Sequence, residues 1–139
     1  MKLLKYMIAA FLFAAVSIEI SAKPVKMEHL YMFGFSASFK DSTLYITDIQ
    51  DVQGAWIDTR TNFLIDRSEY SQQLRSWLTE KKQENNRVCL VVFATSKRDA
   101  EKKYAKLKKK YVGKKAAPYD IRYLADFKFK AIEMSSEEQ

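Results

Sequence analysis

Carboxylates are the residues of this chain that come closest to a catalytic pattern. Asp48, Asp51, Asp58 and Asp66 lie within one short stretch. Two carboxylates held at a fixed separation across a sugar can hydrolyse a glycosidic bond. Aspartate is also a common turn residue, because its side chain hydrogen-bonds the nearby backbone. We therefore expect turn and cap roles here, and keep as the alternative a small hydrolase that uses Asp48, Asp51 or Asp58.

Other chemistries that need particular side chains find few candidates. His29 is the only histidine and Cys89 the only cysteine, so we expect neither a zinc site nor an internal disulfide. The aspartate spacing does not match a calcium-binding loop. Residues 34–38 resemble a nucleophile elbow, but Ser38 stands where the last glycine is needed. Phosphate-binding glycine loops are missing from the sequence. We predict no metal, no cofactor and no catalytic residue.

One polar stretch could bind a small ligand. An aromatic side chain next to hydrogen-bonding groups in a loop suits recognition of a sugar or a peptide. The predicted ligand-binding residues are Trp56, Asp58, Arg60 and Asn62. The alternative is that Trp56 belongs to the core and that Asp58 and Arg60 form a turn.

The positive charge of the chain is concentrated in one segment. The formal net charge is +7, and residues 97–115 alone contain ten basic and two acidic residues. Such a surface can attract anionic lipid, glycan or phosphate. No aromatic side chain interleaves the outward lysines, so we do not expect nucleic acid. The alternative is a solvated helix face with lysines near its C-terminus. The predicted anionic-partner residues are Lys102, Lys103, Lys106, Lys109 and Lys110.

A predicted strand and helix carry these lysines. Residues 88–94 form an unbroken apolar run, which predicts an interior strand covered on both faces. Ser96 then offers a helix cap, and Gly113 marks the end of the helix. The residues at helical spacing that should face the sheet are Ala100, Tyr104, Leu107 and Tyr111.

The other elements follow from alternating and helical patterns. Residues 29–39 and 43–51 alternate as a β-hairpin, and residues 120–132 as a long final strand. Residues 69–82 form a helix capped by Ser68, with Tyr70, Leu74, Trp77 and Leu78 buried. Residues 52–67 are a small hairpin or an ordered loop. The order β-β-α-β-α-β predicts an α+β fold, a two-layer sandwich in which a mostly antiparallel sheet of about four strands carries both helices on one face.

The first residues resemble a targeting segment. Lys2 and Lys5 precede an uncharged apolar run that is too short for a comfortable membrane span, and Ala22 follows as a small residue. We predict a signal peptide over 1–22 and a single domain over 23–133. Residues 134–139 should form a disordered acidic tail. The protein would be periplasmic or secreted, with no transmembrane segment after cleavage.

Part of the chain resembles a known domain family. Val92-Phe93, Ser96-Lys97, Ala100 and Leu107 resemble the second strand–helix unit of the SPOR domain. That family comprises two-layer α+β domains of the bacterial envelope that bind peptidoglycan stripped of its stem peptides. The resemblance covers residues 87–109 and extends more loosely to about residue 130. It implies a glycan-binding envelope domain.

A second resemblance covers nearly the whole mature chain, and it is to a group of small exported bacterial proteins of unassigned function. It implies export and one domain, but no activity. The segments that carry it are residues 33–39, 47–50, 70–75, 91–94 and 119–124.

Together these patterns predict a non-catalytic exported envelope protein. Its partner would be a cell-wall glycan such as peptidoglycan, an anionic envelope surface or an envelope protein. Besides the hydrolase, the remaining alternative is an interaction subunit that pairs with another chain through an exposed sheet edge.

Overall fold

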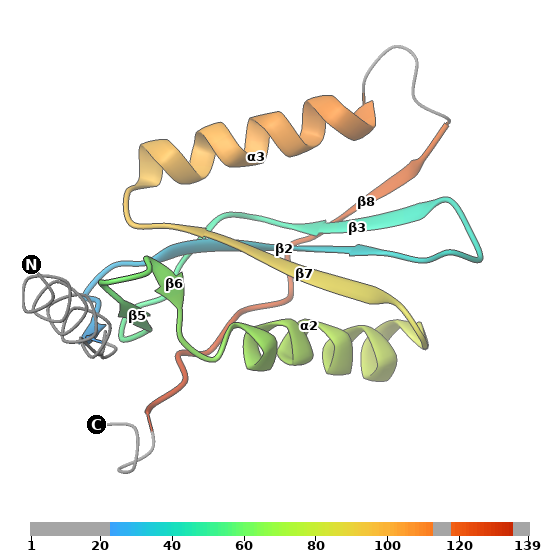
Figure 1. Ribbon diagram of the computed structural model, residues 1–139. Helices are drawn as coiled ribbons and strands as arrows, with labels where there is room; N and C mark the ends of the chain where they lie inside the picture. The colour runs from blue at the N-terminus through green and yellow to red at the C-terminus, as the bar shows by residue number, and fades with distance from the viewer. Residues whose placement is uncertain (1–22, 113–117, 135–139) are drawn as a thin grey trace, which may run out of the picture.

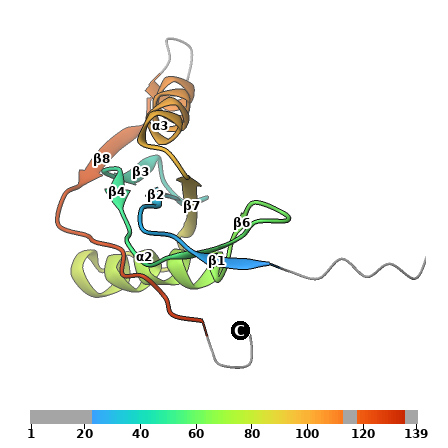
Figure 2. The ribbon, with the colours of Figure 1, turned by 90° about the vertical axis from the view of Figure 1, so that its left-hand side faces the viewer.

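The computed structural model describes residues 23–112 and 118–134, and its centre is the strand β2 (Tyr31–Ala37) (Figure 1). Along its whole length β2 pairs antiparallel with β7 (Val88–Ala94). Its other side pairs antiparallel with β3 (Thr43–Thr47) and, further along, with β4 (Gln50–Asp51). The last strand, β8 (Asp120–Leu124), lies parallel to β3. Across this five-stranded sheet, β7 and β8 are therefore the two edges (Figure 2).

The two helices cover opposite faces of this sheet, with α3 (Lys97–Val112) on one side and α2 (Arg67–Lys82) on the other (Figures 1 and 2). The fold is α+β as predicted, but the prediction of two layers with both helices on one face is wrong. The reason is that β2 is apolar on both faces. Phe33 packs against Tyr104 of α3, whereas the position of Gly34 lies against Leu74 of α2.

A second, three-stranded sheet accounts for the strands that were not predicted. It contains β1 (Pro24–Lys26), β5 (Trp56–Asp58) and β6 (Phe63–Leu64), in the order β1-β5-β6. From residue 23 onward, six strands, not two, therefore precede α2. The region over 52–67 is a small hairpin, one of the two forms expected for it.

The predicted final strand over 120–132 is wrong beyond Leu124. After β8 the chain leaves the sheet and crosses to the side of α2, where Phe127 and Phe129 are buried. Side-chain amides replace the strand ladder there. The Gln50 amide donates to the Phe127 carbonyl (2.8 Å) and accepts from the Phe129 backbone N–H (2.8 Å). Gln73 holds the Lys130 backbone in the same way, with both distances at 2.9 Å.

The helices agree with their patterns except at one end. In α2 the residues Tyr70, Leu74 and Leu78 are buried and Trp77 is half-buried, as predicted. The predicted cap at Ser68 is wrong, because the helix begins two residues earlier than predicted and Asp66 stands at the N-cap with a positive φ of 60°. In α3 the predicted cap is confirmed. The Ser96 hydroxyl accepts from the Asp99 backbone N–H at 3.2 Å.

Some predictions fall outside the described residues. They are the signal peptide over 1–22, the helix end at Gly113 and the tail beyond residue 134. Met134, which was assigned to the tail, is buried. No helix in the described segments is long and apolar enough to cross a membrane.

Candidate binding surface

The outer edge of β7 is open to another strand. In the described part of the chain, β2 is the one strand that pairs with β7. The carbonyl groups of Val91 and Phe93 accept hydrogen bonds from helix side chains, so they point away from β2. Residues in an antiparallel pair alternate between partnered and outward-facing backbone groups. Cys89, Val91 and Phe93 therefore direct their backbone N–H and C=O groups to the outer edge, where Arg67 already bonds the Val91 carbonyl and Lys103 the Phe93 carbonyl.

Two apolar side chains lie exposed next to this edge. Val88 is 41% exposed and Leu90 is 51% exposed, so the prediction that the whole strand is interior is wrong. The cause is the path of α3. Tyr104 contacts Phe33, but Tyr111 near the helix end contacts Tyr119, which precedes the opposite edge strand (ring centroids 5.4 Å apart). The helix therefore leaves the start of β7 uncovered.

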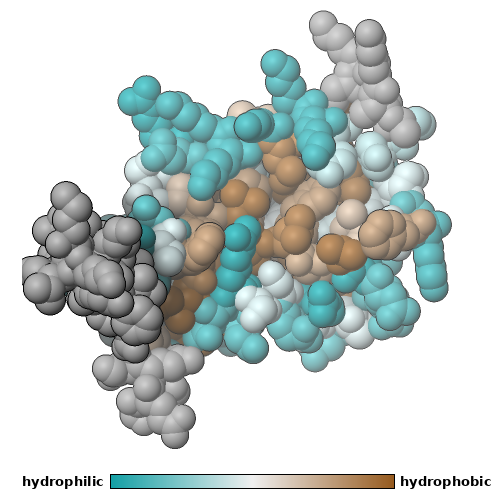
Figure 3. All heavy atoms as spheres, in the orientation of Figure 1, coloured by the Kyte–Doolittle hydropathy of each residue, from teal (hydrophilic) through white to brown (hydrophobic). Residues whose placement is uncertain are grey.

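The exposed apolar residues form part of a hydrophobic band that hydrophilic side chains interrupt. Figure 3 shows hydrophobic atoms across the middle of the molecule, where β7 lies in front in Figure 1, between hydrophilic atoms above and below. Phe39 is 97% exposed at the tip of the β2–β3 hairpin. It lies two residues beyond Ala37, the partner of Val88, and so stands at the same end of the sheet. This end of the edge is apolar.

The other end of the edge is cationic. Arg67 donates to the Val91 carbonyl through Nη2 (2.6 Å) and Nε (3.0 Å). The ammonium group of Lys103 donates to the Phe93 carbonyl at 2.8 Å. Both cations also lie 5.6 Å from the centroid of the Phe93 ring, a distance typical of cation–π contacts. One helix from each face thus sends a positive side chain to the outer edge of β7, Arg67 to its middle at Val91 and Lys103 to its end at Phe93.

A shallow pocket of about 380 Å³ continues the edge beyond β7. Its lining joins the end of the strand, the first turns of α3 and the β5–β6 turn. The lining residues are Asn62, Phe93, Ala94, Thr95, Asp99, Lys102 and Lys103. Asn62 from the predicted ligand site and two lysines from the predicted basic site therefore meet here, which the sequence patterns did not indicate.

The predicted basic ridge is exposed along the outer side of α3. On the inner side Ala100 is buried, and Tyr104, Leu107 and Tyr111 are half-buried, as their spacing predicted. The five predicted side chains all lie outward. They are Lys102, Lys103, Lys106, Lys109 and Lys110.

The predicted ligand residues around Trp56 do not form one site. The Asp58 carboxylate accepts from the backbone N–H groups of Arg60 (3.0 Å) and Lys23 (3.1 Å). These hydrogen bonds, that to Arg60 first, hold the pKa of Asp58 below its ordinary value. Asp58 thus organises a turn, the alternative expected for it. Trp56 is half-buried, and Arg60 is exposed.

The aspartates proposed for hydrolysis are engaged by different partners. Asp48 accepts from Lys128 (3.2 Å) and from the Gln50 amide (3.0 Å). Asp51 pairs with His29 at 2.7 Å, while Asp58 organises its turn. Each of the three carboxylates thus has partners of its own among the described residues.

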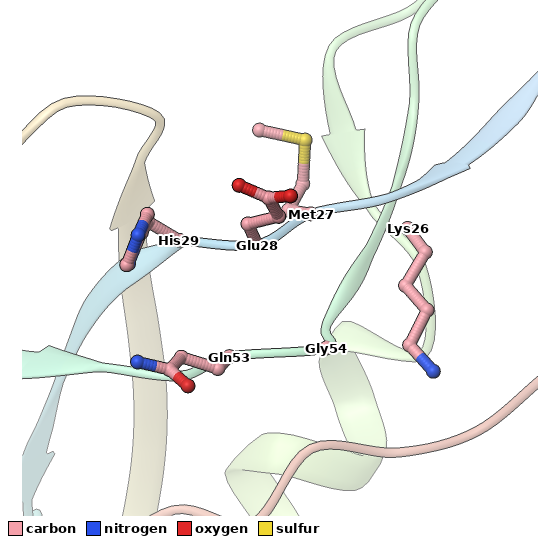
Figure 4. Close-up of a pocket in the computed structure, with 6 residues that line it drawn as sticks. All are labelled: Lys26, Met27, Glu28, His29, Gln53 and Gly54. Carbon is pink, nitrogen blue, oxygen red and sulfur yellow. The ribbon is translucent and has the colours of Figure 1, made fainter.

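A second pocket, of about 470 Å³, lies where β1 leads into β2. Figure 4 shows that its side chains diverge: Lys26 lies at one end, His29 and Gln53 at the other. The Lys26 ammonium is paired with Glu133 at 3.1 Å. With no convergent polar groups, this hollow supports no chemistry.

The described segments hold no group of three or more residues that could bind a metal ion. Compared with protein-family models, curated proteins and solved structures, the chain matches none of them. The outer edge of β7 and the pocket beside it are therefore the features that bear on function.

Proposed function

We propose that this chain is a non-catalytic binding protein that takes up an extended segment of a partner protein as an additional strand on β7. The observation that carries the proposal is the exposure of Leu90 beside a strand edge that no other strand of the described residues pairs with. Natural sheets normally protect such edges with charges, proline or a bulge. The sequence of β7, VCLVVFA, contains none of these residues.

The opposite edge provides the contrast within the same sheet. On β8 the side chains of Asp120 and Arg122 form an exposed ion pair at 2.9 Å. Charged residues of this kind oppose edge-to-edge pairing. Of the two edge strands, only β7 therefore has no charged residue of its own.

The energy of strand addition comes from two sources. Each new backbone hydrogen bond contributes on the order of 1 kcal/mol. Burial of apolar side chains adds about 25 cal/mol per Å², and Val88 and Leu90 offer such area. Strand addition is an established mode of peptide recognition, with backbone bonds for affinity and side-chain contacts for specificity.

Charge disfavours a second copy of this chain as the occupant. In a symmetric antiparallel pairing centred on Val91, the two Arg67 guanidinium groups would meet at the centre of the interface. Like charges so placed destabilise the pair. We therefore infer a different protein, and the signal-peptide pattern of residues 1–22 makes it an envelope or secreted one.

Hydrogen exchange with a defined peptide tests the proposal. The probe is a nonapeptide with two aspartates followed by alternating valine and threonine. We expect it to slow exchange of the outward amides of Cys89, Val91 and Phe93, while those of Leu90 and Val92 are already protected by β2. N-methylation of the peptide on its β7-facing side should abolish the effect. N-methylation of the other side should preserve it.

Variants make the test specific for this edge. Leu90→Lys should prevent peptide binding, because it places a charge in the apolar contact. Tyr123→Lys is the matched control, since Tyr123 is 56% exposed on the opposite edge strand. Equal binding by both variants, or unchanged exchange of the β7 amides in the wild-type protein, would refute strand addition.

A second candidate function rests on the exposed lysine ridge of α3, which could bind an anionic envelope surface. Vesicles with and without anionic lipid test it. Lys106→Glu with Lys109→Glu should then remove salt-sensitive binding to the anionic vesicles, whereas Leu90→Lys should preserve it. Unchanged vesicle binding by the double variant would reject this role.

A further inference from the structure

We infer that the segment bound on β7 carries a carboxylate beside Phe93 and Ala94, and that Lys102 and Lys103 bind this group. The inference rests on the proposed strand addition and adds the chemistry and direction of the partner. It identifies the occupant as an extended segment with an acidic end and an apolar end.

The outer edge of β7 is continuous with the pocket. Phe93, Ala94 and Thr95 line the pocket and are also the last residues of β7 and the one after it. A strand that follows the outer edge past Phe93 must therefore lead into this space. Asn62 lies on its other wall, in the turn between β5 and β6.

The pocket has an excess of positive charge. Lys102 and Lys103 are both exposed there, and Asp99 is the acidic member of the lining. Arg67 adds a third cation at Val91, one outward position before Phe93. A neutral occupant would leave this excess of positive charge uncompensated, whereas a carboxylate would be attracted to it.

Lys103 has more hydrogen-bond donors than its contact with Phe93 uses. Its ammonium group has three donors, and one of them reaches the Phe93 carbonyl. A carbonyl oxygen has two acceptor sites, so a partner N–H can bond the same oxygen without displacing the lysine. The remaining donors of Lys103 are then available to the incoming carboxylate.

The direction of the partner strand decides which of its ends carries the acidic residues. Antiparallel pairing is slightly more stable per residue than parallel pairing. An antiparallel partner has its N-terminal end at Ala94 and its C-terminal end at Val88. The acidic residues should therefore come first in the partner sequence, followed by apolar residues at every second position that contact Val88 and Leu90.

Three nonapeptides and two double variants test this inference. The peptides are the aspartate-first probe, the same peptide with asparagine in place of aspartate, and one with the aspartates at the C-terminal end. At low salt we expect the aspartate-first peptide to bind about fivefold more tightly than the others, the effect of two partly exposed ion pairs. Lys102→Gln with Lys103→Met should remove this advantage and leave affinity for the asparagine peptide unchanged.

The control double variant is Lys109→Gln with Lys110→Met, which removes two charges from the same helix away from the pocket. We expect it to keep the fivefold preference. The carboxylate site is refuted if the control variant loses the preference for the aspartate-first peptide. It is also refuted if the aspartate and asparagine peptides bind equally while both protect the β7 amides. In either case strand addition stands. Equal affinity for the C-terminal aspartate peptide would refute the antiparallel direction. If no peptide protects the β7 amides, the proposed function itself fails.

Discussion

Arg87 joins two separate parts of the fold from a buried position. Its side chain is 1% exposed, and Nε donates to the Ser36 hydroxyl at 3.1 Å. Its guanidinium group also donates to the Thr43 carbonyl and contacts Asp41 and Glu84, both at 3.4 Å. The group thereby connects the β2–β3 hairpin with the segment that leads from α2 into β7.

Removal of this guanidinium should be costly. Arg87→Met would leave the Thr43 carbonyl and the Ser36 hydroxyl without their donor, and we expect a loss of about 3 kcal/mol in the free energy of unfolding. Urea denaturation measures it. Lys128→Met is the control, because the pair of Lys128 with Asp48 is exposed and should change stability by less than about 1 kcal/mol. Similar losses in the two variants would contradict this role for Arg87.

Gly34 is a position in β2 that α2 approaches closely. A Cβ atom there would lie 2.7 Å from Leu74 Cδ2 and 3.1 Å from Phe129 Cζ. We expect Gly34→Ala to lower the free energy of unfolding by about 1–3 kcal/mol through overpacking. A double-mutant cycle with Leu74→Ala checks the cause, since the glycine substitution should cost less once Leu74 is truncated. Strictly additive losses would rule out this clash.

At the scale of elements, the segment that follows β8 depends on glutamine side chains for its backbone hydrogen bonds. Gln50→Met should leave the buried Phe129 N–H without an acceptor, at a cost of about 1–3 kcal/mol. Exchange of the Phe129 amide should become faster, whereas that of core β2 amides should change only with global stability. Gln72→Met on the exposed side of α2 is the control. An unchanged Phe129 amide would contradict the bridging role of Gln50.

The elements differ in how far their sequences determine them. The helix α3 was predictable, because Ala100, Tyr104, Leu107 and Tyr111 recur at helical spacing and its cap is local. The open edge at β7 was not, because an apolar run has the same pattern whether a neighbouring strand covers it or not. The departure of the chain after Leu124 was also hidden, since Phe127 and Phe129 continue the alternation of β8. Gln50, which bonds the backbone of both residues, is distant from them in sequence.

The candidate site was predictable only in its parts. Lysines on α3 were recognised from charge density, and Asn62 from its polar loop. Their meeting at one pocket depends on the β5–β6 turn approaching the end of β7, which no local pattern indicates. The role of Arg67 could not be predicted from the sequence, because it depends on the Val91 carbonyl, 24 residues away.

At the scale of the whole molecule, charge should control self-association through β7. The edge is apolar at one end, while Arg67 and the α3 lysines oppose a second copy. Salt shortens electrostatic range from about 10 Å at 0.1 M to about 3 Å at 1 M. We expect a monomer at low salt and weak association at high salt, measured by sedimentation. Leu90→Lys should stay monomeric at both. Wild-type association that weakens with added salt would contradict this balance.

The position of β2 has a consequence for the order of events during synthesis. Its first partner, β3, follows within a short hairpin, but Ala37 must wait for Val88, about fifty residues later. A ribosome adds roughly 5–20 residues per second, so the hairpin spends roughly 3–10 seconds with one side of its central strand unmatched. During that interval the nascent chain has an unfilled place for a strand, which β7 later occupies. The finished protein has the same feature one strand further out, because the outer side of β7 has no partner strand among the described residues.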